Sequence, residues 1–130
     1  MKRITLILFG VFLFSCTTQN EKDLIGVWKF VSGNYTFSDT SMTISDNINL
    51  KSIKIYGDTH YSLVTQNKVE EYFSAHSGLY LLEGDEYTEM FKIHKDPDMI
   101  GKSATFQYKI NGNQLVISSE YLKEVWEKIE

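Results

Sequence analysis

Few side chains in this chain have the types and spacing that chemistry requires. Cys16 is the only cysteine, so no intramolecular disulfide can form and the lone thiol must have another use. The three histidines, His60, His76 and His94, are 16 and 18 residues apart, whereas zinc sites usually contain closely spaced ligand pairs. We therefore expect no metal site, and we expect these histidines at the surface or at hairpin ends.

Catalytic signatures are absent from the sequence as well. The chain contains no Gly-x-Ser-x-Gly elbow and no glycine-rich phosphate loop. Asp96 and Asp98 flank Pro97, but a calcium loop needs more carboxylates at fixed spacing. We therefore expect a protein that is not an enzyme and that needs no cofactor.

Aromatic residues and one carboxylate form the remaining candidate site. Tyrosine combines apolar area with a polar tip, which suits the wall of a ligand cavity and equally a filled core. Strand alternation places Glu89 on one face with Tyr87 and Phe91. Glu89 is then a polar anchor for a ligand, a partner in an internal salt bridge, or a residue on an outward face. The candidate ligand-binding residues are Tyr61, Tyr80, Glu89, Phe91, Phe106 and Tyr108.

Short strands joined by tight turns must position these side chains. Three turns of hairpin length contain glycine, at 57–59, 83–85 and 111–113. The segment 38–49 is expected to be a loop with one weak strand at 42–44, 69–74 is ambiguous, and 121–128 has helical propensity as an alternative. The expected strands are 27–32, 52–56, 60–65, 77–82, 86–94, 103–110, 114–119 and 123–129.

This pattern predicts an all-β fold of about 8–10 strands. Consecutive hairpins favour an up-and-down antiparallel meander, and closing the meander into a β-barrel removes its exposed edges. The number of strands, and whether the barrel is complete, stay open at this point.

The N-terminus has the order of a secretory signal. Lys2 and Arg3 precede an apolar run over 4–14 that is too short to span a membrane as a helix. The ending Leu13-Phe14-Ser15-Cys16 resembles the lipobox of bacterial lipoproteins, whose cysteine is acylated and becomes the new N-terminus. This resemblance implies a signal peptide at 1–15, a lipidated Cys16 with a polar tether over 16–23, and a single domain at 24–130.

The charge of the expected mature chain limits its partners. The full sequence has a net charge of −4, and removal of Lys2 and Arg3 leaves eleven basic residues against seventeen acidic ones, or −6. An acidic surface without a basic cluster argues against nucleic acid. The expected location is the cell envelope, where the lipid anchors the protein to a bacterial membrane outside the cytoplasm.

Gly26-Val27-Trp28 near the start of an all-β chain resembles the lipocalins, and more specifically the lipocalin-like domains of small bacterial lipoproteins. Gly78-Leu79-Tyr80, the segment 82–89 and Trp126-Glu127-Lys128 contribute to that resemblance. The resemblance implies that Trp28 plugs one barrel end and that a basic side chain from the last strand, Lys128 here, packs over it. The chain departs from typical lipocalins because it has neither a disulfide nor a clear C-terminal helix.

Two functions follow as expectations. The first is a membrane-anchored lipocalin-like lipoprotein that binds a small, partly hydrophobic ligand inside the barrel. The alternative is a protein-interaction or inhibitor module of the cell envelope, with a filled barrel, no ligand and a protein partner that the sequence does not identify. A cavity lined by aromatic residues favours the first, and a solid interior favours the second.

Overall fold

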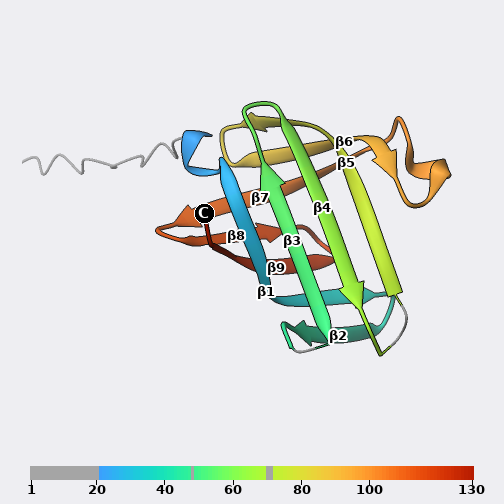
Figure 1. Cartoon of the computed structure of the whole chain (residues 1–130). Helices are drawn as coiled ribbons and strands as arrows, with labels where there is room; N and C mark the ends of the chain where they lie inside the picture. Colours follow the sequence, from blue (N-terminus) through green and yellow to red (C-terminus); the bar gives the residue numbers. More distant parts are fainter. Residues whose placement is uncertain (1–20, 48, 70–71) are drawn as a thin grey trace, which may run out of the picture.

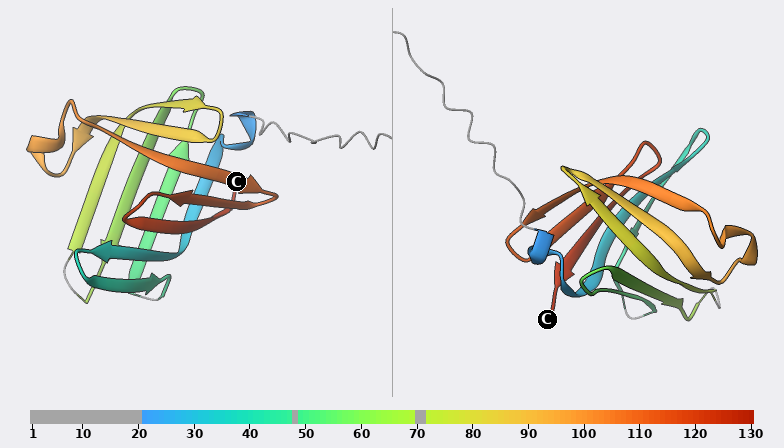
Figure 2. Two further views of the ribbon diagram at one scale, coloured as in Figure 1. Left: turned by 180° about the vertical axis from the view of Figure 1, so that it is seen from behind. Right: turned by 90° about the horizontal axis from the view of Figure 1, so that it is seen from above.

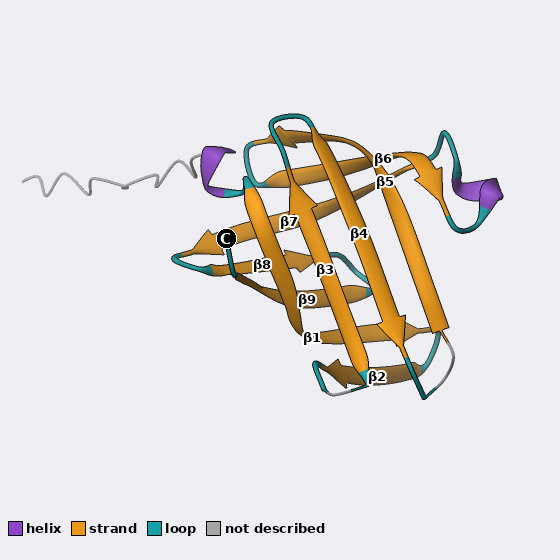
Figure 3. Ribbon diagram, viewed as in Figure 1, coloured by secondary structure: helices purple, strands orange, loops and turns teal. Residues whose placement is uncertain are grey.

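The computed structural model describes residues 21–47, 49–69 and 72–130, which form nine strands and two short 3-10 helices (Figure 1, Figure 3). The predicted signal peptide, Cys16 and the first part of the tether lie outside the described residues. The elements in chain order are η1 (Glu21–Asp23), β1 (Gly26–Phe37), β2 (Thr40–Ser45), β3 (Leu50–Tyr56), β4 (His60–Asn67), β5 (Tyr72–Glu83), β6 (Glu86–His94), η2 (Pro97–Met99), β7 (Ser103–Asn111), β8 (Gln114–Ser118) and β9 (Leu122–Lys128).

The nine described strands belong to one antiparallel sheet that closes on itself. From β3 to β9 each strand pairs with its neighbour in sequence, and β1 pairs with β3 and with β9. This closure makes a barrel of eight strands, β1 and β3 to β9. The ninth strand, β2, pairs with the second half of β1 and lies outside this ring of strands (Figure 2). The predicted all-β, up-and-down antiparallel barrel is therefore confirmed.

The first strand changes its partner along its length. Its beginning, from Gly26 to Lys29, pairs with β3, whereas the part from Ser32 to Phe37 pairs with β2. The register between β1 and β9 shifts between Phe30 and Ser32, and such a bulge bends a strand. The second half of β1 therefore separates from β3 and forms a hairpin with β2. This hairpin lies at the end of the barrel opposite η1 (Figure 1).

Pairing between strands decides the structure of three segments, as far as their residues are described. Residues 40–45, within the expected loop, form the complete strand β2, because β1 continues to Phe37 and pairs with it. The helical alternative at 121–128 is wrong, because β9 pairs with β1 on one side and with β8 on the other. The described part of 69–74 joins β5 from Tyr72 onward.

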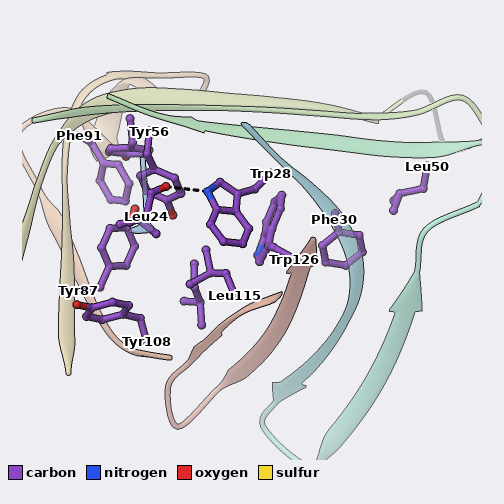
Figure 4. Packing of buried hydrophobic residues seen from close by; sticks show 12 residues of the cluster. Leu24, Trp28, Phe30, Leu50, Tyr56, Tyr87, Phe91, Tyr108, Leu115 and Trp126 are labelled. Atoms are coloured by element: carbon purple, nitrogen blue, oxygen red, sulfur yellow. Dashed lines mark hydrogen bonds between the residues drawn. The ribbon is translucent and has the colours of Figure 1, made fainter. Parts of the chain in front are cut away.

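Large side chains fill the barrel end next to η1 (Figure 4). Trp28 is fully buried, and its indole Nε1 donates a hydrogen bond to the Leu24 carbonyl at 2.8 Å. Leu115 and Tyr108 close the same region. Lys128 Nζ lies 5.3 Å from the centroid of the Trp28 ring and donates to a carbonyl of η1. An indole face attracts a cation, so this contact adds to the packing.

Gly26 has a steric reason to be glycine. Its φ is +137°, and a Cβ at this position would lie 2.3 Å from the Glu130 carbonyl oxygen and 2.7 Å from Lys128 Cε. The backbone of the C-terminal residue therefore approaches β1 more closely than a side chain allows. The glycine of the Gly-x-Trp sequence permits Glu130, after the end of β9, to pack against the start of β1.

Candidate ligand-binding cavity

A cavity of about 700 Å³ that is partly open to solvent lies at the other end of the barrel. Its walls come from the second half of β1, from β2, and from parts of β3, β4, β5 and β9. Trp126 separates it from the filled end, because this indole lies between Trp28 and Phe30 in the interior (Figure 4). The volume lies within the range of pockets that hold small molecules.

One wall of the cavity is aromatic and carries a carboxylate. Glu124 and Trp126 are two residues apart on β9, so alternation turns both toward the interior. The Tyr35 hydroxyl donates to Glu124 Oε1 at 2.9 Å, and the Trp126 indole donates to Glu124 Oε2 at 3.0 Å. Phe30 packs edge-on against Trp126, with ring centroids 5.4 Å apart. The carboxylate is therefore fixed among three aromatic rings.

The wall formed by β3, β4 and β5 carries small hydroxyl side chains. Ser52, Thr65 and Ser74 are consecutive cross-strand partners, and all three line the cavity. The hydroxyl oxygens of Ser52 and Thr65 lie 2.6 Å apart and share a hydrogen bond. Leu50 and Leu63 add apolar area to the same wall. The cavity can therefore contact both apolar and hydrogen-bonding parts of a ligand.

A buried ion pair crosses the interior between β3 and β6. Lys54 Nζ lies 2.7 Å from Glu89 Oε1, and the two side chains are 4% and 3% exposed. The Tyr87 hydroxyl donates a hydrogen bond to the same carboxylate oxygen at 2.5 Å. The Lys54 ammonium also lies 5.3 Å from the centroid of the Trp126 ring, so the pair is next to the cavity wall.

Each member of this pair keeps its partner ionised. Burial by itself would raise the pKa of the Glu89 carboxyl, but the Lys54 ammonium, together with His76 and the hydrogen bonds from Lys54 and Tyr87, outweighs burial and holds that pKa below its ordinary value. Burial would likewise lower the pKa of Lys54, but the attraction of Glu89, with further contributions from Tyr56 and Glu124, outweighs it, so that the pKa of Lys54 is raised. Both groups are charged at neutral pH.

His76 connects the ion pair with the cavity. Its Nδ1 lies 2.9 Å from the Tyr61 hydroxyl and 3.8 Å from Glu89 Oε2, and its side chain lines the cavity. Burial lowers the pKa of His76 to about 4, although the nearby Glu89 opposes this shift. The imidazole is therefore neutral at neutral pH, and it links a buried charge to the ligand space.

The structure also brings two of the three histidines together. His76 and His94 are cross-strand partners, and their rings stack with centroids 5.3 Å apart. Within residues 21–47, 49–69 and 72–130, no group of three His, Cys, Asp or Glu side chains is arranged to hold a metal ion.

The six residues predicted to bind a ligand pack around the buried ion pair, His76 and Tyr87. Glu89 forms the internal salt bridge that the sequence offered as an alternative, and Tyr61 and Phe91 pack against His76. Tyr80, Phe106 and Tyr108 pack around Tyr87. None of the six is among the described residues that line the cavity. Their role in ligand binding stays a prediction.

The residues at the cavity were missed because their sequence signals are weak. Alternation along β3 places Leu50, Ser52, Lys54 and Tyr56 on one buried face. From the sequence alone, however, a lysine at such a position indicates a surface face, because lysines are rarely buried. Glu124 lies in a segment that had helical propensity. The pairing of β9 with both β1 and β8 is what places this carboxylate inside.

Comparison with known proteins shows that the fold of this chain is similar to that of two solved structures. No family model and no curated protein matches the chain. A lipocalin-like protein from Bacteroides uniformis ATCC 8492 is 18% identical with a TM-score of 0.60, and an uncharacterized protein from Bacteroides eggerthii DSM 20697 is 14% identical with a TM-score of 0.57. Each similarity covers 82% of this chain and 99% of the other chain. The fold is thus a lipocalin-like antiparallel β-barrel.

The described residues contain no helix that is long and apolar enough to cross a membrane.

Proposed function

We propose that this protein is a lipid-anchored protein of the cell envelope that binds a small, partly hydrophobic molecule and does not act as an enzyme. The cavity of about 700 Å³, with aromatic side chains on one wall and hydroxyl groups on another, is the observation that carries the proposal. Pockets that bind small molecules combine a mainly apolar lining with a few placed polar groups. The alternative, an interaction module with a filled barrel, requires an interior without such a space.

The position of the tether is compatible with access to the cavity. β1 starts beside η1, to which the tether leads, and its far half lines the cavity (Figure 1). A lipid on Cys16 would therefore attach the protein through its filled end. The cavity would lie toward the opposite end, away from the point of attachment.

Native mass spectrometry of the protein purified without its lipid tests this function. We expect a bound small molecule that survives purification, or a mass shift when a pool of amphiphilic compounds is added. Ser74→Trp fills the cavity with a large ring, whereas Ser62→Trp places the same ring on the exposed outer face of β4. Loss of the adduct in the first variant alone supports binding in the cavity. Absence of any adduct in the wild type contradicts the proposal.

A further inference from the structure

The charge that faces the cavity has one sign. Among the described residues that line it, Glu124 is the one with a formal charge at neutral pH, because burial keeps His76 neutral. Next to the cavity, the positive charge of Lys54 is matched by Glu89 at 2.7 Å. Lys54 also interacts electrostatically with Glu124, but the one positive charge of Lys54 faces the two negative charges of Glu89 and Glu124, so the net charge at the cavity is negative.

Glu124 is held in place by hydrogen bonds from uncharged groups. Its two hydrogen-bond donors, the Tyr35 hydroxyl and the Trp126 indole, are uncharged groups. Each carboxylate oxygen has two acceptor sites, and each of these bonds uses one of them. The carboxylate therefore has further capacity to accept hydrogen bonds, in an orientation that Tyr35 and Trp126 fix.

The aromatic rings around this carboxylate also favour a positively charged group on the ligand. The edges of aromatic rings are positive and their faces are negative, so a cation within about 6 Å of a ring centroid is attracted to the face. Phe30, Tyr35 and Trp126 line the cavity together with Glu124. Aromatic rings together with one carboxylate are a combination that recognises organic ammonium groups.

We propose that the cavity takes an amphiphile whose polar end is a positively charged nitrogen. This inference rests on the proposed function and adds the chemical class of the ligand. The ammonium group lies beside Glu124 and the rings of Tyr35 and Trp126, and the apolar part of the ligand contacts Leu50 and Leu63. A carboxylate amphiphile binds poorly, because it places a second anion beside Glu124, and no lysine or arginine is among the described residues that line the cavity.

Three probes with the same alkyl chain separate the effect of the head group from that of the chain. Decyltrimethylammonium, decanol and decanoate are cationic, neutral and anionic, and each is titrated into the protein below the concentration at which it forms micelles. Isothermal calorimetry gives the affinity, and Trp126 provides a fluorescence signal at the cavity. We expect the ammonium probe to bind about tenfold or more tightly than decanoate, with decanol in between.

A pair of variants assigns the preference to one carboxylate. Glu124→Gln keeps the shape of the side chain and can still hydrogen-bond to Tyr35 and Trp126, because a tyrosine hydroxyl accepts as well as donates. Glu127→Gln removes the same charge from the same strand, but at an exposed pair with Lys29. We expect the first variant to reduce the ratio of ammonium to decanoate affinity to within about threefold of unity, and the second to leave it unchanged.

The outcomes separate this inference from the function on which it rests. If decanol binds, and decanoate binds with the same affinity as the ammonium probe, the proposed ligand class is wrong while the binding function stands. Equal loss of preference in Glu124→Gln and Glu127→Gln would mean that overall negative charge, not the cavity, selects the cation. If none of the probes binds, both the ligand class and the binding function are contradicted. If Glu124→Gln fails to fold, the order of the three probes on the wild type still decides.

Discussion

Lys54 and Glu89 are 35 residues apart in the sequence, yet their side chains form a 2.7 Å ion pair in the interior, where they are 4% and 3% exposed. The two residues belong to β3 and β6, which are not neighbours in the sheet, so the pair spans the barrel. Such a pair is costly to bring out of water, and it is more costly to leave one of its members alone. This relationship gives the first prediction.

Replacing Glu89 with Gln should lower the free energy of unfolding by about 3–5 kcal/mol, because Lys54 then stays buried without a counter-charge. Chemical denaturation with urea measures the change. The double variant Lys54→Met with Glu89→Gln should recover part of the loss. Glu127→Gln, which breaks the exposed pair with Lys29, should cost no more than about 1 kcal/mol. Equal effects of Glu89→Gln and Glu127→Gln would contradict the structural role of the buried pair.

Acid should weaken the fold in a range set by His76. Its pKa is lowered from the ordinary 6.5 to about 4 in the folded protein, so the unfolded chain binds a proton at a higher pH than the folded one. Stability therefore decreases as the pH falls from about 6.5 toward 4. His76→Gln should flatten the dependence of the unfolding free energy on pH in this range. The exposed His60 provides the control, and His60→Gln should leave the slope as it is.

A second loss of stability is expected at lower pH. Burial would raise the pKa of Glu89, but the Lys54 ammonium, together with His76 and the hydrogen bonds from Lys54 and Tyr87, keeps it below its ordinary value in the folded protein. A depressed carboxyl pKa stabilises the fold above the pKa of the unfolded chain, and this contribution disappears as the pH falls through the folded value. Thermal melts below about pH 4.5 should show this decrease in the wild type and in His76→Gln. They should not show it in the double variant Lys54→Met with Glu89→Gln.

Gly26→Ala should destabilise the protein more than alanine at another glycine with positive φ. At Gly26 a Cβ would meet the Glu130 carbonyl at 2.3 Å, whereas at Gly84, with φ of +66°, no atom lies within 4 Å. Gly84→Ala therefore pays only for the backbone conformation, about 1–2 kcal/mol. We expect at least about 1 kcal/mol more for Gly26→Ala. Thermal unfolding of the two variants compares them directly, and similar values would speak against close packing of the C-terminus on β1.

Replacing Cys16 with Ser should release the protein from the membrane fraction, because the proposed lipid anchor requires the thiol of this residue. Fractionation of cells that express the wild type and the variant, followed by immunoblotting, measures the distribution. Thr17→Ser, which alters the neighbouring position and leaves the thiol, serves as control and should stay with the membrane. Unchanged membrane association of the Cys16→Ser variant would rule out acylation of this cysteine as the anchor.

Much of the fold follows from local patterns in the sequence. The glycine turns at 57–59, 83–85 and 111–113 join the strands that the alternation predicts, and Gly84 and Gly112 adopt positive φ there. These features depend on neighbouring residues, so they can be predicted without knowledge of the tertiary structure. The identity of the buried Trp28 as a barrel-end residue came from the resemblance of its short motif, and not from periodicity.

The sequence alone determined that the chain is all-β, that its strands form an up-and-down meander, and which segments are turns. Only the tertiary structure decided that β1 bends away from β3, that Lys54 meets Glu89 across the interior, and that Glu124 faces a cavity beside Trp126. Strand alternation states that a side chain is on one of two faces, but closure of the sheet decides which face is inside. Contacts across a barrel join residues that are distant in sequence, and no local pattern encodes them.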